Sequence, residues 1–529
     1  MAYLPVGLFV EFSGQFCSGS RQDFRKAGGI ETLDEFRYET EWRSNLPNKL
    51  NANGSFSAAE DLSFVRRTLE LGRLNLHTKD PSMTCYSKLS AICIWSASIS
   101  VLFSSSAAAD NWPTWMGPTH DGVYRESGIV ESIPSEGLPV TWRYSIGGGY
   151  AGPAVSGDNV VVFDYLKKDG DAFNDPGKRA TLAGRERVTC LDASTGKLRW
   201  SKQYDCPYSI SYPAGPRCTP TIDGDRVYTL GSEGDLHCYQ MKDGELLWSK
   251  NFKRDFQAEI LIWGASAHPL IDGDLLYAMV GGKGQGIVAL DKMTGDVVWK
   301  ALDVESGYCP PSIVEFGGRR QLIVYHPKGV TSVDPSNGTE YWSKPIEPKY
   351  QMSIARPMVD GDLMYASGIG HVSMMLKLNS EEPGAEVLWR GNPKNSLYSA
   401  NATPMFVDGV LYGSDCKVGS LIAVDAKTGD RLWQTFEATQ PGEKRMVNHG
   451  TAFLTRVGDT DRYLILGETG QLMLAKLTRE KFESLGAFQA LEPTGEAFGR
   501  KVLWSHPAYA NRTAYIRNDK EIIAVDLAK

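Results

Sequence analysis

Polar side chains recur beside the prolines of a series of short apolar segments. Aligned on these prolines, the candidate ligand-binding residues are Arg217, His268, Tyr308, Arg356, Asn401, His449 and His506, with Thr219, Thr403 and Thr451 beside them. Guanidinium and imidazole groups bind carboxylates and other anions, so a ring of these residues around one axis would form an anion site. The alternative is that these residues only line a water-filled channel, whose wall needs polar side chains. For any single residue this alternative is a sufficient explanation.

Three of the eight histidines belong to this set: His268, His449 and His506. Imidazole is a common metal ligand, and histidines from different segments could converge on one ion. Against this, no His/Cys cluster has the spacing of a zinc site. No carboxylate that would orient the histidines can be identified either. We therefore predict no metal site.

The candidate residues belong to a repeated sequence. The segment LIAVDAKTGDRLW (421–433) predicts a half-buried strand, a tight turn at Gly429 and a return strand. Copies occur at 188–200, 236–248, 287–299 and 330–342, with a looser one ending at Trp389. Successive tryptophans of this motif, from Trp200 to Trp433, lie 48, 51, 43, 47 and 44 residues apart. This spacing is typical of a repeat architecture.

Each copy follows a hairpin with a proline-containing strand, an Asp-Gly or Gly-Asp turn and a second strand, as in RCTPTIDGDRVYTL (217–230). One unit is therefore four antiparallel strands, and such units repeated around an axis form a propeller. The eighth unit lacks a return strand, which the segment 138–145 can supply. We predict an all-β fold: an eight-bladed β-propeller of four-stranded antiparallel blades, whose last blade is closed by an N-terminal strand.

The return strands carry one large anchor each: Trp142, Trp200, Trp248, Trp299, Trp342, Trp389, Trp433 and, in the degenerate seventh unit, Leu485. A buried aromatic ring removes about 150–250 Å² from water, so a tryptophan can fill the space between adjacent blades. Because nearly every unit carries one, we predict that these tryptophans dock the blades structurally and do not stack on a ligand.

The N-terminal region has the layout of an export signal. From Met83, a short segment with Lys88 precedes an apolar stretch (89–103) and small residues that end at Ala109. This pattern predicts a signal peptide at 83–109, cleaved after Ala109, and a periplasmic or secreted protein. Residues 1–82 would then be a disordered product of an over-extended gene model. An uncleaved anchor is the alternative, but its apolar core is shorter than the roughly 20 residues that span a bilayer.

The remaining chain of this 529-residue sequence divides into an irregular lead-in (110–136) and the propeller (137–529). The net charge of −7 gives no basic footprint, so a nucleic-acid partner is not expected. An insertion at 167–187 lengthens the first blade and is either a recognition loop or a solvated hairpin tip. Six cysteines of this region are either disulfide-bonded or small buried residues: Cys190, Cys206, Cys218, Cys238, Cys309 and Cys416.

The element A/C-x-D-x-x-T-G-x-x-x-W is complete at 190–200, 289–299 and 423–433. It resembles the tryptophan-docking repeat of the pyrroloquinoline quinone (PQQ)-like propellers, a superfamily that includes quinoprotein alcohol dehydrogenases and the BamB-like outer-membrane assembly factors. The lead-in NWPTWMGPTHDG is similar to the opening of exported bacterial proteins built on this repeat. The resemblance covers roughly 111–526 and is specific for fold but weak for function.

The enzymes of this superfamily typically have adjacent cysteines over the quinone and a calcium set of Glu, Asn and Asp. This sequence has no Cys-Cys pair and no C-x-x-C-H haem motif, and the calcium set matches no positions in it. The resemblance therefore implies an exported, non-catalytic scaffold without a cofactor, a monomer that binds an envelope protein or peptide and meets the membrane only indirectly. The alternatives are a PQQ-dependent dehydrogenase of alcohols or sugars, with PQQ and calcium as cofactors, and a carbohydrate- or anion-binding module.

Overall fold

The computed structural model describes residues 111–443 and 445–529, which belong to one compact unit. The expected signal peptide (83–109) and the segment 1–82 lie outside the described residues. Within the described part, no helix is long and apolar enough to cross a membrane.

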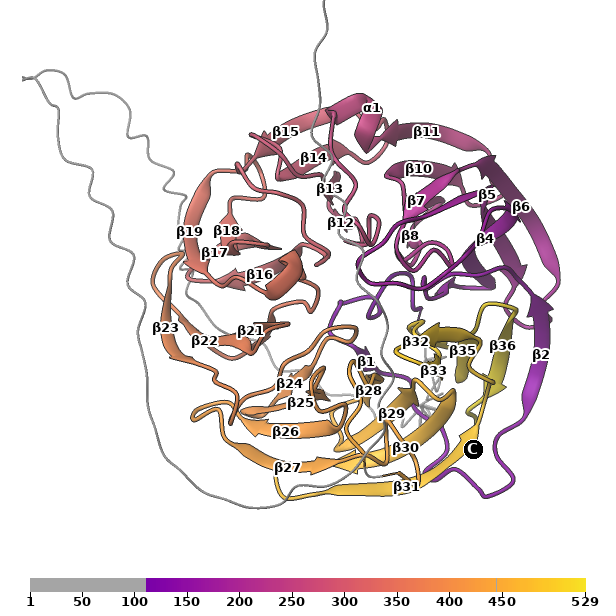
Figure 1. The fold of residues 1–529 in the computed structure, drawn as a ribbon, viewed down its shortest axis with the longest axis vertical. Coiled ribbons are helices and arrows are strands. Elements are labelled where there is room, and N and C mark those ends of the chain that lie inside the picture. Colours follow the sequence, from indigo (N-terminus) through magenta and orange to yellow (C-terminus); the bar gives the residue numbers. More distant parts are fainter. Residues whose placement is uncertain (1–110, 444) are drawn as a thin grey trace, which may run out of the picture. The chain divides into compact units, whose positions relative to one another are not determined.

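Eight antiparallel sheets are arranged around one axis, as the view in Figure 1 shows. Six of them have four strands and two have five, so the predicted eight-bladed propeller is confirmed. The first strands of the eight blades, on the side toward the axis, are β3 (Ala154–Ser156), β8 (Thr221–Asp223), β12 (Leu270–Asp272), β16 (Ser312–Phe316), β20 (Met358–Asp360), β24 (Met405–Val407), β28 (Ala452–Val457) and β34 (Ala508–Ala510). The second strands are β4 (Asn159–Asp169), β9 (Arg226–Leu230), β13 (Leu275–Met279), β17 (Arg319–His326), β21 (Leu363–Gly368), β25 (Val410–Ser414), β29 (Arg462–Gly467) and β35 (Thr513–Arg517).

The third strands are buried along most of their length. They are β5 (Ala180–Asp192), β10 (Asp235–Gln240), β14 (Ile287–Asp291), β18 (Gly329–Val333), β22 (Val372–Leu378), β26 (Leu421–Asp425), β30 (Gln471–Leu477) and β36 (Glu521–Asp526). The outer strands are β6 (Leu198–Asp205), β11 (Leu246–Asn251), β15 (Val297–Ala301), β19 (Glu340–Pro345), β23 (Ala385–Arg390), β27 (Arg431–Thr435), β31 (Phe482–Gln489) and β2 (Val140–Ser145). Most residues of the outer strands are exposed or half-buried, whereas the middle strands are covered on both faces by neighbouring blades.

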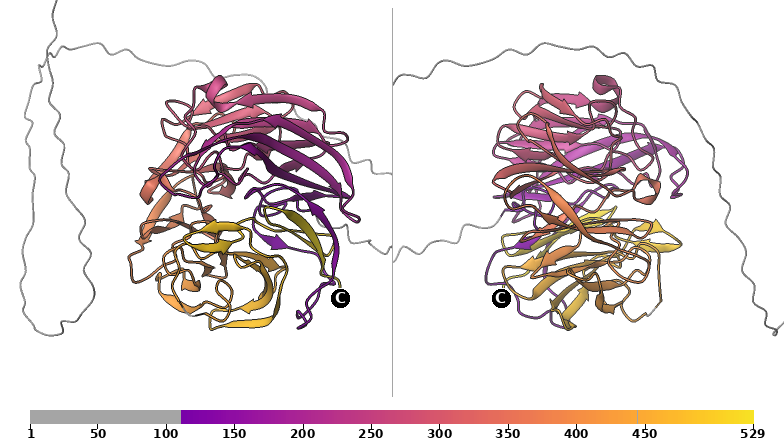
Figure 2. Two further views of the ribbon diagram at one scale, coloured as in Figure 1. Left: turned by 45° about the vertical axis from the view of Figure 1, so that its right-hand side comes forward. Right: turned by 90° about the vertical axis from the view of Figure 1, so that its left-hand side faces the viewer.

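The last blade is closed by the N-terminal strand, as predicted. Strand β2 pairs antiparallel with β36, with Trp142 opposite Ala524 and Arg143 opposite Ile523. Figure 2 shows this N-terminal strand in purple beside the yellow C-terminal strands. Joining the two ends of the chain in one sheet removes the open edges that an unclosed ring would have.

The repeat motif joins each blade to the next. Its tryptophan lies on the outer strand and donates its indole N–H to a backbone carbonyl in the motif turn of the following blade. The pairs are Trp142 to Ala193, Trp200 to Met241, Trp248 to Lys292, Trp299 to Pro335, Trp389 to Ala426 and Trp433 to Thr478, at 2.7–3.1 Å. Trp342 differs, because it donates to the side chain of Gln321 in its own blade at 2.8 Å.

Two further residues of the motif determine the shape of the turn against which the tryptophan packs. In the first blade, Asp192 accepts the backbone N–H groups of Ser194 (3.1 Å) and Thr195 (2.9 Å), which fixes the turn. In the second blade, Gly244 has φ +72°, and a Cβ there would lie 2.5 Å from the ring of Trp200. The turn glycine is thus required both for its backbone conformation and for the tryptophan of the preceding blade.

Because of this double role, we predict that Gly→Ala substitutions at two glycines of the same blade lower the free energy of unfolding by different amounts. Gly224 also has a positive φ, +58°, but nothing lies within 4 Å of a Cβ built there. We expect Gly244→Ala to lower the free energy of unfolding by about 1–2 kcal/mol more than Gly224→Ala, because only the first crowds the docked ring. Urea denaturation of both variants measures the difference. Equal costs would mean that the Trp200 contact adds nothing beyond backbone strain.

Several elements depart from the regular four-stranded pattern. The lead-in contributes β1 (Val123–Tyr124), which pairs parallel with β28. The insertion at 167–187 extends β4 and β5, and β7 (Tyr208–Ile210) pairs with β5. A separate hairpin, β32 (Gly495–Ala497) and β33 (Arg500–Val502), precedes the eighth blade, and the short helices are α1 (Phe252–Phe256) and η1 (Lys349–Gln351). The six cysteines of the propeller are all buried and form no disulfide bond, so they are small buried residues of the core.

Candidate ligand-binding cavity

The connections that lead into the inner strands surround a cavity of about 720 Å³. Six of the seven candidate residues line it: Arg217, His268, Tyr308, Asn401, His449 and His506. Each lies two to four residues before an inner strand, because the proline that marks the alignment sits at the entrance of that strand. The volume lies within the roughly 300–1,000 Å³ typical of small-ligand sites.

Arg356 does not line this cavity. Its guanidinium donates to the backbone carbonyl of His120 in the lead-in, and its Nε has no partner among the described residues. Its backbone N–H donates to the hydroxyl of Thr403 at 3.1 Å. Arg356 therefore holds the lead-in against the fifth blade. The sequence missed this role because a hydrogen bond to a backbone carbonyl leaves no pattern of residue types.

The lead-in forms the floor of the cavity. Trp112 exchanges backbone hydrogen bonds with Val155 of β3, and the carbonyl of Pro113 accepts the N–H of Ile222 in β8 at 2.7 Å. Farther along the segment, β1 pairs with the end of β28 in the seventh blade. These contacts lie toward the far ends of the inner strands, whereas the cavity is lined by residues that precede the strands. The segment thus crosses the axis and closes one end of the central channel.

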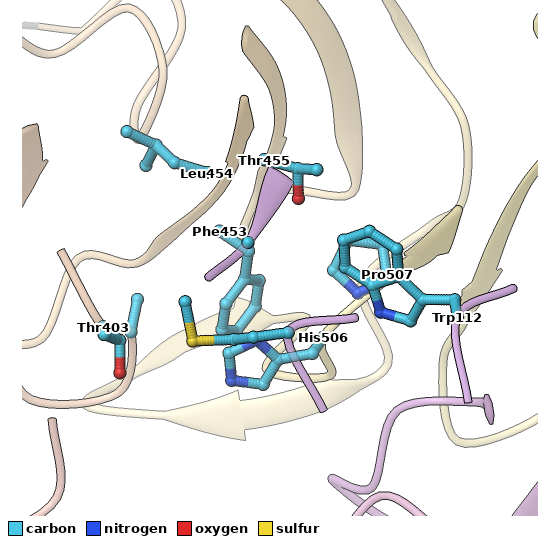
Figure 3. Close-up of a pocket in the computed structure, with 10 residues that line it drawn as sticks. Trp112, Thr403, Phe453, Leu454, Thr455, His506 and Pro507 are labelled. Carbon is cyan, nitrogen blue, oxygen red and sulfur yellow. The ribbon is translucent and has the colours of Figure 1, made fainter. Parts of the chain in front are cut away.

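A second, small space lies against this floor. Figure 3 shows it between Trp112, Thr403, Phe453, His506 and neighbouring residues. Its volume is about 20 Å³, enough for one water molecule. The ring of His506 contacts that of Phe453, with centroids 4.1 Å apart. His506 and Thr403 line both spaces and therefore stand between the floor and the main cavity.

Aromatic side chains form a large part of the wall, and the sequence predicted only Tyr308 among them. They are Trp115, Tyr150, Tyr212, Trp263, Tyr308, Tyr350, Tyr398, Phe498 and Trp504. Trp115 comes from the lead-in, and its ring stacks on His268 at a centroid distance of 5.1 Å. The others come from connections that differ in length from blade to blade, so they share no repeat position. Some of them lie close in the sequence to the prolines that precede the inner strands, and this position could have identified them.

Two inserted segments meet at the mouth of the cavity. The tip of the 167–187 insertion contributes Pro176 and Gly177, and the β32–β33 hairpin contributes Phe498, which stacks on His449 at 5.0 Å. The side chain of Asn174 donates to the carbonyl of Glu496 at 2.6 Å and so joins the two segments. The insertion that the sequence singled out therefore borders the candidate site.

The charge of the cavity is positive. Its lining includes Arg217, Lys349 and Lys417, and no Asp or Glu is among the described residues that line it. The candidate histidines are neutral at neutral pH, because burial lowers the pKa of His449 to about 4 and that of His506 to about 3. The positive charge therefore comes from one arginine and two lysines, and the histidines offer neutral hydrogen-bonding groups.

The lining residues do not fit PQQ with calcium. Calcium prefers several oxygen ligands with carboxylates among them, and the lining offers the amides of Asn401 and Asn448 and the hydroxyls of Ser266 and Thr403. Nor do the described residues contain a cluster of three or more His, Cys, Asp or Glu side chains that could hold a metal ion.

Comparison with known proteins agrees with the repeat. A family model described as outer membrane protein assembly factor BamB matches residues 184–435. BamB of Bordetella pertussis is 23% identical over 320 residues, which are 54% of this chain and 77% of that protein. BamB of Moranella endobia is 26% identical over 264 residues, which are 46% of this chain and 61% of that protein. The crystal structure of BamB from Moraxella catarrhalis matches with a TM-score of 0.44 and 15% identity, covering 69% of this chain and 98% of that one. With its motif, its eight blades and this family match, the chain is a PQQ-like β-propeller protein.

Proposed function

We propose that this chain is an exported, non-catalytic propeller that recognises a protein partner in the cell envelope through the face on which the cavity opens. The observation that carries the proposal is the central cavity, closed below by the lead-in and lined by aromatic rings and cations without a carboxylate. Such a wall can bind an apolar or anionic group, but it lacks the carboxylates that would act as general acid, general base or metal ligand.

The relatives support an envelope partner. Two of them carry the name outer membrane protein assembly factor, and the family model with the same description spans the second to the sixth blade and part of the first. A propeller is a rigid scaffold on which the loops of one face can recognise another protein. In this chain the loops at the cavity mouth include two inserted segments, which add surface to that face.

Site-specific photo-cross-linking in the producing cell tests this proposal. The photoreactive residue is placed at Tyr350, which lines the cavity mouth and is 72% exposed. The matched control position is Asp362, an exposed residue in the turn between β20 and β21 at the opposite end of the same blade. We expect a protein adduct from position 350 and none from position 362, with an exported protein identified by mass spectrometry.

Two results contradict the proposal. One is equal capture, or no capture, at the two positions. The other is saturable binding of PQQ and calcium to the purified protein, followed by absorbance, together with substrate-dependent reduction of a dye in the presence of alcohols or sugars. The second result would make the chain a dehydrogenase and the cavity its active site.

A further inference from the structure

The cations of the cavity are not neutralised by the protein. None of Arg217, Lys349 and Lys417 forms an ion pair among the described residues. Arg217 donates only to neutral oxygens, including the carbonyls of Ser211 (2.8 Å) and Tyr212 (2.7 Å). Unpaired cations that share one cavity are unusual in a chain whose net charge is −7. They create a field that attracts an anionic group.

Two carboxylates beside the wall are already paired with arginines. Glu468 accepts the indole N–H of Trp504 from behind the wall at 3.0 Å and pairs with Arg500 at 2.8 Å. Asp415 is buried and pairs with Arg431 at 3.2 Å. Neither carboxylate lines the cavity, so the charge of the three cations is left for a ligand.

The floor offers polar atoms without partners. Both ring nitrogens of His268 and the indole N–H of Trp115 are shielded from solvent and make no hydrogen bond to the described protein. Leaving such a group unpaired costs about 1–3 kcal/mol. A ligand that reaches the floor with an oxygen atom would accept from Trp115 and from the protonated nitrogen of His268.

The rim is apolar and exposed. Tyr350 and Phe498 line the mouth with exposed fractions of 72% and 46%. Phe173 (39%) precedes the lining residue Pro176 by three positions, and Met446 (71%) lies two positions before Asn448, which also lines the cavity. Exposed apolar side chains that continue beyond a cavity mark contact with a macromolecule, because a small anion buried in the cavity would not cover them.

We infer that the cavity receives an acidic segment of a partner polypeptide, with its carboxylates near Arg217, Lys349 and Lys417 and its apolar side chains against the aromatic wall. The inference rests on the proposed function, since it assumes that the partner is a protein bound at this face. It assigns the partner's chemistry: carboxylates alternate with apolar residues in the bound segment. The rim side chains cover the rest of the partner's contact surface.

Fluorescence anisotropy with the full chain and a labelled Glu-Phe-Glu-Phe-Glu peptide tests the inference. We expect saturable binding that weakens as salt rises. The double variant Lys349→Gln with Lys417→Gln should bind about tenfold more weakly, since two charge contacts are lost. The matched control is Lys242→Gln with Lys427→Gln, two exposed lysines in motif turns that lie outside the cavity, and it should bind like the parent chain.

Three outcomes overturn the inference: the control double variant weakens binding equally, a Lys-Phe-Lys-Phe-Lys peptide binds as well as the acidic one, or trigalacturonate binds whereas the acidic peptide does not. The last would make the ligand an acidic sugar. Failure here is distinguishable from failure of the proposed function. A partner cross-linked at position 350 together with no binding of the acidic peptide would retain protein recognition and reject the acidic segment.

Discussion

Replacing Arg517 with methionine is expected to lower the free energy of unfolding by about 3–6 kcal/mol, because each hydrogen bond from a charged group contributes about 1.5–3 kcal/mol. Arg517 ends β35 in the last blade and is fully buried. Its guanidinium donates to the carbonyls of Phe163 and Gly147 at 2.8 Å each, and both belong to the beginning of the propeller. Methionine fills a similar volume but leaves these carbonyls without a donor.

The large expected effect follows from the position of Arg517 at the closure of the ring. Strand β2 completes the last blade, and Trp142 docks that blade on Ala193 of the first. Arg517 adds a contact between the same two blades near the axis, where the first strands of the chain begin. A ring that opens loses the packing between its first and last blades, so the loss at this seam should affect the whole propeller.

A matched variant separates this buried role from the general effect of removing an arginine. Arg143 lies on β2 at the same seam, but its side chain is 52% exposed and pairs with Glu521 at 3.0 Å. Exposed ion pairs contribute about 0–1 kcal/mol, so Arg143→Met should be nearly neutral. Urea denaturation of both variants is the measurement. Costs within about 1 kcal/mol of each other would contradict the closing role of Arg517.

The sequence was sufficient to predict the blades because each blade repeats one interaction. The tryptophan of one unit needs the turn glycine of the next, as Trp200 and Gly244 demonstrate, so the pattern returns with every blade. The closing strand was predictable for the same reason, since Trp142 is a motif tryptophan without a strand before it in its unit. Elements that do not take part in this repeated contact between blades have no recurring sequence pattern. The lead-in crosses the axis through contacts made once each, and the β32–β33 hairpin occurs in one blade only among those described.

The candidate site was predictable only in part, for a related reason. The marker prolines located residues before the inner strands, and most of these line one cavity. Whether such a residue lines the cavity or contacts the floor depends on the path of the lead-in. The spacing of the repeats contains no information on that path. Arg356 illustrates this, because it directly precedes its proline as His268 does, but its guanidinium binds the lead-in whereas His268 lines the cavity. The aromatic wall comes from connections of unequal length, and apart from Tyr308 it was missed.

The second large effect concerns pH. Glu186 on β5 is fully buried, and its carboxyl accepts hydrogen bonds from the hydroxyls of Tyr204 and Tyr208 (2.6 Å for Tyr208) and from the backbone N–H of Ser232 (2.9 Å). The pKa of Glu186 is raised from 4.5 to about 7: burial raises it most and the nearby carboxylate of Asp235 adds to the rise, while the three hydrogen bonds lower it. The folded protein therefore binds this proton more tightly than the unfolded chain does.

The sign of the effect follows from this difference in proton binding. Below pH 4.5 Glu186 is protonated in both states, and its contribution is constant. Between pH 4.5 and 7 the unfolded chain releases the proton first, so stability falls as pH rises through this window. The total loss is about 3 kcal/mol, since one pKa unit corresponds to about 1.4 kcal/mol. Above pH 7 the group is ionised in both states, and no further change is expected from it.

Glu186→Gln isolates this contribution from the buried histidines, which act in the opposite direction. Burial lowers the pKa of His120 and His326 to about 4, so below pH 6.5 the unfolded chain takes up protons that the folded protein does not, and stability falls as pH falls. Both chains share that loss. The difference in unfolding free energy should therefore move in favour of Glu186→Gln by about 3 kcal/mol from pH 4.5 to 8. The exposed control Glu305→Gln should give a curve parallel to the parent chain. A parallel curve for Glu186→Gln as well would mean that the buried carboxyl titrates like an exposed one.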